Sequence, residues 1–137
     1  MEASVKFSFK LNIGCPKKYM PNKNLINFLK KNNDKIKIFN DSKKAASGSD
    51  VVFTDKVISM NDKVNKAKKL KDFKNFKVNS KVMNFAKKDA IFLHCLPRDS
   101  EVSSEVFLGK QSKVWQQALN RVYVQKSILL YCFGKLR

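Results

Sequence analysis

The residues from Phe92 to Arg98, which read Phe-Leu-His-Cys-Leu-Pro-Arg, are the strongest candidates for chemistry in this sequence. Cys95 directly follows an apolar run, and a thiol placed after a buried strand lies at the mouth of a parallel sheet, where ligands bind. Pro97 stiffens the loop. A cysteine that merely packs is the usual alternative, because free cysteine is among the most buried residue types. The position of Cys95 between His94 and Leu-Pro-Arg favours a functional thiol.

A second group of polar residues follows another apolar run. Residues 50–54 form that run, and Asp55, Ser59 and Met60 come after it. Taken alone, Asp55 could cap a turn, and Ser59 and Met60 could belong to an ordinary loop. Because this loop and the Cys95 loop both directly follow a buried strand, we predict that they lie together at one end of a parallel sheet.

Strands and helices alternate along the chain. The expected strands are residues 10–15, 35–39, 50–54 and 90–94. The expected helices are residues 2–10, 22–33, 42–49, 64–76, 80–87 and 114–133. This order predicts an α/β fold in which a Rossmann-like parallel sheet carries helices on both faces. The runs at 50–54 and 90–94 are continuously apolar, as in strands that are buried on both faces.

The formal net charge of +18 could indicate a polyanion partner such as nucleic acid. The alternative is a solvated surface rich in lysine, and two observations favour it. Nucleic-acid readers commonly use arginine for bidentate and stacking contacts, but arginine occurs only at Arg98, Arg121 and Arg137. The lysines also lie on nearly every segment instead of in one block. We therefore expect no nucleic-acid partner.

The composition indicates a single globular domain of 137 residues, 43% of them apolar. No apolar run reaches the roughly eighteen residues of a membrane span, and the first residues lack the apolar core of a signal peptide. The cysteines are Cys15, Cys95 and Cys132, and none forms a Cys-x-x-Cys pair. We expect reduced thiols in a cytoplasmic protein that does not associate with membranes. A single histidine excludes a histidine-rich metal site.

At residues 94–98, His-Cys-Leu-Pro-Arg resembles the signature of ornithine carbamoyltransferases. The related aspartate enzymes typically carry proline where Cys95 stands. Residues 50–60 resemble the ornithine loop of the family, Asp-x-x-x-Ser-Met-Gly, and residues 117–121 resemble its final helix, Gln-Ala-Glu-Asn-Arg. Residues 13–21 follow its strand-to-loop pattern. The resemblance covers almost the whole chain, with the motifs in the family's order.

The resemblance implies that the ornithine side-chain amine attacks the carbonyl of carbamoyl phosphate, giving citrulline and phosphate without a metal or cofactor. It implies that Asp55 holds the ornithine α-ammonium through a charge-assisted contact. The segment with Ser59 and Met60 would close over the amino-acid end. Cys95 would lie beside the attacking amine and is not expected to be a covalent nucleophile.

The resemblance also assigns the carbamoyl phosphate side of the site. Cys95 and the Leu96 backbone would border the carbamoyl group, and Arg121 would bind the oxygen where negative charge develops. The amine must lose a proton, which a thiolate or the phosphate itself could take. His94 orients the loop or transfers a proton, and the first role is favoured. Arg98 contacts a ligand or pairs with a nearby glutamate, and a ligand contact is favoured.

Departures from the family pattern affect this reading. Asn61 stands where the family has glycine, and Leu119 and Tyr123 replace the usual glutamate and histidine. The sequence contains neither a Ser-Thr-Arg-Thr-Arg segment, which holds carbamoyl phosphate in the family, nor the Asp-Gly-x-Asn-Asn turn that follows its first central strand. We therefore expect residues 1–137 to form an ornithine-binding domain without its first strand and without the carbamoyl-phosphate domain.

Full enzymes of this family are trimers with sites shared between subunits and domains. Because this chain lacks the residues that bind the phosphate, it is expected to be inactive alone. Two other classes of function stay open. One is a carbamoyltransferase that acts on a different amine, although Asp55 and the Ser59-Met60 pair favour ornithine. The other is a non-enzymatic basic domain that binds a polyanion, which salt-sensitive binding to any DNA would reveal.

Overall fold

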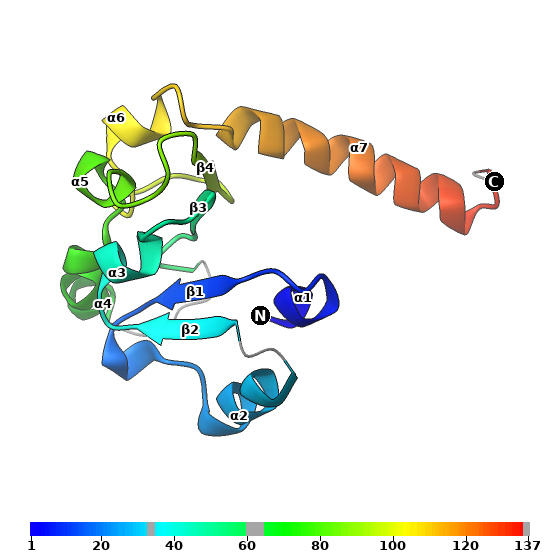
Figure 1. Cartoon of the computed structure of the whole chain (residues 1–137). Helices are drawn as coiled ribbons and strands as arrows, with labels where there is room; N and C mark the ends of the chain where they lie inside the picture. The colour runs from blue at the N-terminus through cyan, green and yellow to red at the C-terminus, as the bar shows by residue number, and fades with distance from the viewer. Residues whose placement is uncertain (33–34, 60–64, 136–137) are drawn as a thin grey trace.

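The computed structural model describes residues 1–32, 35–59 and 65–135. Its strands are β1 (Leu11–Gly14), β2 (Ile36–Phe39), β3 (Val51–Thr54) and β4 (Ile91–His94). Its helices are α1 (Glu2–Lys6), α2 (Lys23–Asn32), α3 (Ser42–Ala46), α4 (Lys66–Phe73), α5 (Ser80–Met83), α6 (Ser104–Phe107) and α7 (Val114–Cys132). Two 3₁₀ turns, η1 (Lys17–Tyr19) and η2 (Lys74–Phe76), complete the order. The alternation of strands and helices confirms the α/β class (Figure 1).

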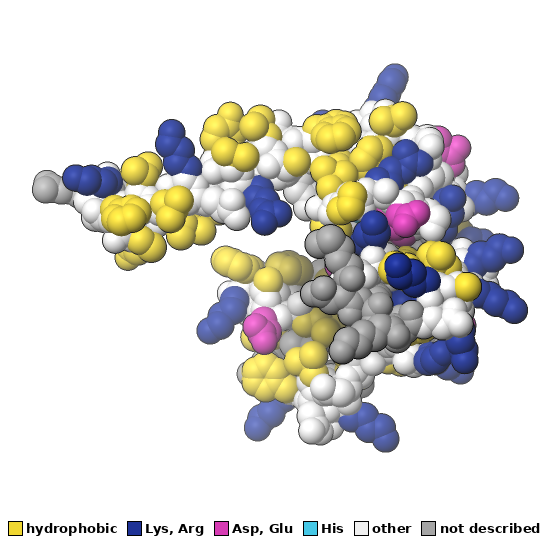
Figure 2. Space-filling view, turned by 180° about the vertical axis from the view of Figure 1, so that it is seen from behind, with side chains coloured by type: hydrophobic (Ala, Val, Ile, Leu, Met, Phe, Trp, Pro, Cys, Tyr) yellow, Lys and Arg dark blue, Asp and Glu magenta, His cyan; other side chains and the backbone are white. Residues whose placement is uncertain are grey.

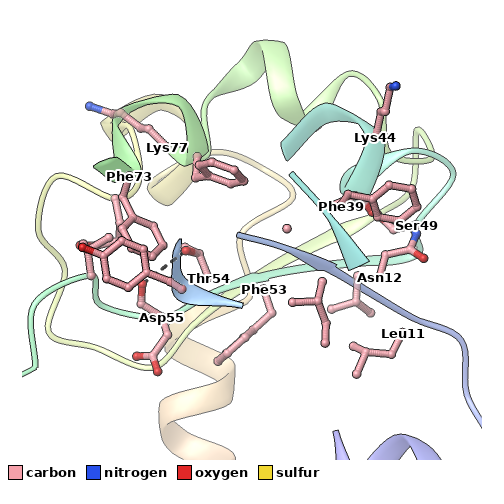
Figure 3. A pocket seen from close by; sticks show the side chains of 18 of the residues that line it. Leu11, Asn12, Phe39, Lys44, Ser49, Phe53, Thr54, Asp55, Phe73 and Lys77 are labelled. Atoms are coloured by element: carbon pink, nitrogen blue, oxygen red, sulfur yellow. Dashed lines mark hydrogen bonds between the residues drawn. The ribbon is translucent and has the colours of Figure 1, made fainter. Parts of the chain in front are cut away.

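The strands form two parallel pairs. β1 pairs with β2, and β3 pairs with β4 so that Thr54 lies opposite His94. β1 and β3 are not paired with each other, and a cavity between them is lined by residues of both strands. Leu11 and Ser49, near the beginnings of β1 and β3, lie at one end of this cavity, whereas Asp55 lies at the other (Figure 3). The two pairs therefore run in the same direction, as in one parallel sheet with a space at its centre.

The hydrophobic core lies around the β3–β4 pair. Phe92, at the centre of β4, has no exposed surface. The buried residues packed into one cluster with it are Ala46, Val52, Val78, Val82, Met83, Val102, Val106, Phe107 and Val114. The segment before α7 pairs with β4, because Phe92 donates to the Gln111 carbonyl at 2.8 Å and accepts from Lys113 at 2.9 Å. Segments that are distant in sequence thus hold β4 in place, and Cys95 follows directly after this strand.

Helix α3 covers the β1–β2 pair from one side. Asp41 caps its start by accepting from the backbone N–H groups of Lys43 and Lys44. A side chain at Gly14 would bring its Cβ to 2.9 Å from that of Ala45, so glycine permits the close approach of β1 to α3. The helix therefore fixes the position of β1 beside the cavity.

The prediction that β3 is buried on both faces is wrong. Val52 is 8% exposed, but Val51 and Phe53 are 47% and 54% exposed. The latter two line the cavity between β3 and β1, where no described element covers them. The apolar side chains on this face of β3 therefore stay partly exposed, because no other described part of the chain packs against them.

The predicted helix at 80–87 is too long, because α5 ends at Met83. The chain beyond it bonds to the turn after α3: Gly48 donates to the Phe85 carbonyl at 2.8 Å and Lys87 donates to the Ser49 carbonyl at 3.1 Å. These tertiary bonds compete with continuation of the helix. The helix predicted at 2–10 likewise ends at Lys6, and the helix predicted at 64–76 is α4 followed by η2.

Helix α7 begins against β4 and extends away from the rest of the molecule (Figure 1). Near its start, Trp115 packs edge-on against Phe107, with ring centroids 5.9 Å apart. Most of its other large apolar side chains are exposed, and Figure 2 shows them interspersed with basic ones. The exposed apolar residues are Leu119, Val122, Tyr123, Val124, Ile128, Leu129 and Tyr131. Cys132 is also exposed, whereas Cys15 is buried.

Within the part of the chain that the structure describes, no helix combines the length and the apolar character needed to cross a bilayer.

Candidate functional site

Asp55 and Cys95 meet where β3 and β4 end. Because Thr54 is the register partner of His94, the residues that follow them emerge side by side at the carboxyl edge of the pair. The Cys95 thiol donates a hydrogen bond to Asp55 Oδ1 at 2.8 Å. The structure thus brings together the two loops that the sequence predicted to lie at one end of the sheet. Asp55 also lines the cavity between β1 and β3, with Phe73 near the same end (Figure 3).

The surroundings of Cys95 keep it in the thiol form. Partial burial of its sulfur raises the pKa of Cys95, and the hydrogen bond to the Asp55 carboxylate raises that pKa further. The backbone N–H of Lys56 acts in the opposite direction but more weakly. A raised pKa means that the thiolate forms only at higher pH than for an ordinary cysteine. The structure therefore disfavours a Cys95 thiolate, one of the two proton acceptors that the resemblance allowed.

The Asp55→Asn substitution should lower the pKa of Cys95, since it removes the carboxylate that accepts the thiol proton. The pH profile of Cys95 alkylation by iodoacetamide, followed by mass spectrometry, should then move to lower pH. Cys132 is exposed and lies on the distant part of α7, so its profile serves as the internal reference. An unchanged Cys95 profile would show that the hydrogen bond to Asp55 does not govern the thiol.

His94 is buried and is occupied by contacts within the chain. Its Nε2 lies 2.9 Å from Glu101 Oε1, with both side chains almost completely buried. Its Nδ1 accepts the backbone N–H of Leu96 at 2.8 Å, and its own backbone N–H donates to Gln117 Oε1 at 3.0 Å. These contacts favour the orienting role for His94 over proton transfer to a ligand.

Glu101 and Gln117 belong to this arrangement but were missed as site residues. Gln117 lies in the Gln-Ala-Leu-Asn-Arg segment, in which the resemblance assigned a role only to the arginine. Glu101 lies seven residues after His94 in a polar loop, and only its burial, with 4% exposed, distinguishes it from a solvated acid. One sequence feature could have identified them. A buried histidine needs a hydrogen-bond partner for each ring nitrogen, and nearby polar side chains are the candidates.

The remaining described residues of the two loops follow the same strand ends. Leu96 is half-buried, has a left-handed backbone with φ of 55°, and precedes a cis peptide bond to Pro97. Arg98 donates to Ser104 Oγ at 2.6 Å, and its guanidinium lies over the Phe107 ring at 5.0 Å. Ser59 is exposed, and Met60 lies outside the described residues.

Arg121 lies on α7, four residues beyond Gln117, and its side chain is exposed. The contact of Gln117 with His94 holds the start of α7 at the site, so Arg121 is one helical turn further along the helix. Among the described residues, Arg121 has no hydrogen bond or ion pair with Asp55 or Cys95. Arg121 therefore lies on α7, which extends away from Asp55 and Cys95, and its exposed side chain is not surrounded by other described site residues.

A parallel α/β arrangement with paired polar groups at the carboxyl edge of its strands defines a Rossmann-like ligand-binding domain. Residues 1–132 match the family model described as aspartate/ornithine carbamoyltransferase, Asp/Orn binding domain. The chain therefore belongs to the aspartate/ornithine carbamoyltransferase family, whose Asp/Orn-binding domain it comprises.

Relatives and solved structures agree with this assignment. The chain is 44% identical over 133 residues to the ornithine carbamoyltransferase of Ruthia magnifica, a match that covers 96% of this chain and 44% of the relative. The anabolic ornithine carbamoyltransferase of Campylobacter jejuni superposes with a TM-score of 0.85 at 35% identity, over 96% of this chain and 46% of that one. The Pyrococcus furiosus enzyme gives a TM-score of 0.85 at 31% identity, over 98% and 45%. The chain thus spans less than half the length of these relatives.

Proposed function

We propose that this chain is the ornithine-binding half of an ornithine carbamoyltransferase. The reaction transfers the carbamoyl group of carbamoyl phosphate to the side-chain amine of L-ornithine, giving L-citrulline and phosphate in cytoplasmic arginine biosynthesis. The observation that carries the proposal is the contact between Asp55 and Cys95 at the carboxyl edge of β3 and β4. Family membership and the names of the relatives support the same reaction.

In this proposal, Asp55 binds the ornithine α-ammonium. The carboxylate already accepts a hydrogen bond from the neutral Cys95 thiol. An ammonium group is a stronger donor to a carboxylate than a thiol, so ornithine would take over this acceptor and release the thiol. Ser59 and Met60 would close over the amino-acid end. The released Cys95 would then border the side-chain amine.

The chemical step forms a bond between the amine nitrogen and the carbamoyl carbon and breaks the bond from that carbon to the phosphate oxygen. The amine loses one proton, and the departing phosphate takes it, because burial, the larger cause of the raised pKa of Cys95, still keeps the thiol protonated after it leaves Asp55. Cys95 and the Leu96 backbone would lie beside the carbamoyl group. Arg121 would neutralise the charge that develops on the carbamoyl phosphate oxygen.

The proposal requires a second polypeptide region that holds carbamoyl phosphate. The relatives are more than twice as long as the stretch matched by this chain, and the assignment of residues 1–132 is to the amino-acid-binding domain alone. The exposed apolar residues along α7 and beside the cavity mark where this region would pack. In the complete enzyme, we propose a homotrimer.

The Asp55→Asn substitution tests the proposal in a complete enzyme, made by joining this chain to the N-terminal half of the Ruthia magnifica relative. The KM for L-ornithine should rise by about 10- to 100-fold, because a charge-assisted hydrogen bond is lost. Asp89→Asn is the matched control, since Asp89 is exposed and precedes β4 at the opposite edge. An unchanged KM for ornithine in the Asp55 variant would refute the assignment of the ammonium contact.

A further inference from the structure

Glu101 is a carboxylate with almost no contact with solvent, although this domain has abundant surface for charged groups. It is 4% exposed and lies in the loop between β4 and α6. Burial of a carboxylate is costly unless hydrogen bonds compensate for lost water. Glu101 Oε1 receives two such contacts, the Asp99 backbone N–H at 2.6 Å and His94 Nε2 at 2.9 Å. Its side chain is therefore held in one orientation against His94.

The second nitrogen of His94 defines which tautomer the ring adopts. Nδ1 is 2.8 Å from the backbone nitrogen of Leu96, and an amide N–H can only donate. Nδ1 therefore carries no proton, and the single proton of the neutral ring lies on Nε2, where it faces Glu101. Glu101, His94 and the Leu96 amide thus form one chain of hydrogen bonds with a fixed direction.

This chain ends at a backbone position that needs support. Leu96 has a φ of 55°, which lies in the left-handed region that is unfavourable for a bulky side chain. The bond from its N–H to the His94 ring stabilises that conformation. On the other side of Cys95, the His94 backbone N–H is bound by Gln117. The backbone N–H groups of the residues before and after Cys95, His94 and Leu96, therefore each donate to a side chain.

We propose that Glu101 and His94 are positioning residues that hold the Cys95–Leu96 backbone in its ligand-binding conformation. Glu101 accepts the Nε2 proton and so stabilises the His94 tautomer whose Nδ1 can accept from the Leu96 amide, and the fixed backbone places the Cys95 sulfur against Asp55. The inference rests on the proposed function, since it names how two residues of that site are held. Neither positioning residue touches the reacting atoms.

The tautomer is measurable in the chain as it exists, because His94 is its only histidine. A long-range ¹H–¹⁵N correlation spectrum of uniformly labelled protein should show one imidazole, protonated at Nε2 and unprotonated at Nδ1. In Glu101→Gln, the loss of the charged acceptor should make the Nδ1-protonated form detectable. A wild-type ring protonated at Nδ1 would overturn the proposal, as would a spectrum that Glu101→Gln leaves unchanged.

Substitutions of His94 separate positioning from a purely structural role. His94→Phe removes the acceptor for Leu96, so exchange of the Leu96 amide with deuterium should accelerate by at least about tenfold. Alkylation of Cys95 at a fixed pH should also become faster as the sulfur leaves Asp55. His94→Asn keeps an acceptor near the position of Nδ1 and should restore most of the slow exchange and the slow alkylation.

Val102→Ala is the control, since Val102 is a buried core residue in the same loop whose apolar side chain makes no hydrogen bond. If that variant changes Leu96 exchange and Cys95 alkylation as much as His94→Phe does, the proposal is refuted, because any loss of stability would then suffice. If His94→Phe does not fold, the tautomer and the Glu101→Gln spectrum decide. None of these measurements uses ornithine or carbamoyl phosphate, so their failure leaves the proposed reaction to its own test.

Discussion

The purified 137-residue chain, supplied with L-ornithine and carbamoyl phosphate, is expected to form no citrulline above the uncatalysed background. Enzymatic transfer depends on holding both reactants in register, a contribution of about 7–11 kcal/mol in well-oriented reactions. In the described structure, the amino-acid side of the proposed site is assembled at Asp55 and Cys95, whereas Arg121 lies exposed on a projecting helix. The described residues therefore contain no assembled site for carbamoyl phosphate, the second substrate of the proposed reaction.

A colorimetric citrulline assay at equal protein concentrations measures this prediction. The positive control is the same chain joined to the N-terminal half of the Ruthia magnifica relative, which should restore turnover. Turnover by the isolated chain within about tenfold of a complete enzyme, whose kcat is commonly 1–10³ s⁻¹, would contradict it. Failure of the joined protein, when folded, to make citrulline would instead count against the proposed reaction.

The sequence predicted that the Asp55 and Cys95 loops lie together because that arrangement depends on local rules. Asp55 and Cys95 each follow an apolar run directly, and adjacent parallel strands bring their carboxyl ends to the same edge. Because Thr54 lies opposite His94, Asp55 and Cys95 come next to each other and their side chains form a hydrogen bond. The alternation of strands and helices gave the fold class on the same local basis.

Other features depended on distant contacts that no spacing rule contains. Glu101 differs from the other acids of its loop only because folding buries it beside His94. The helix predicted beyond Met83 is replaced by bonds to the turn at Gly48, which lies more than thirty residues earlier in the chain. Val51 and Phe53 are apolar, but the described residues leave their side chains about half exposed. Sequence patterns identify such residues as apolar or polar but do not say what they contact.

The polyanion alternative depends on whether the positive charge is organised. Lys and Arg side chains are spread around the outline of the face shown in Figure 2 and do not form a single patch there. Several are engaged locally: Lys18 pairs with Asp72 at 3.3 Å, and Lys87 pairs with Asp50. A dispersed lysine surface of this kind matches a solvated exterior. It gives the DNA-binding class no specific support.

In the complete joined enzyme, Arg121→Ala is expected to lower turnover far more than Lys68→Ala. Loss of a donor aimed at developing negative charge typically lowers kcat by about 100- to 1000-fold. Gln117 ties the start of α7 to the His94 backbone, and Arg121 follows one turn later, so a partner region packed along α7 would enclose its guanidinium near the site. Lys68 lies on the exposed, lysine-rich α4. Changes to such surface residues usually alter stability by no more than about 0.5 kcal/mol.

The measurement is kcat for each variant with both substrates saturating, and Lys126→Ala adds a second control from the same helix. Folding of each variant is checked by its urea midpoint, compared with that of the unsubstituted enzyme. A polyanion-binding role would make the three cations about equally important for DNA affinity and irrelevant to turnover. Equal small effects on kcat would remove Arg121 from the proposed site. Cys95 would then have no cationic partner from this chain, and the carbamoyl phosphate contact would have to come entirely from the joined half.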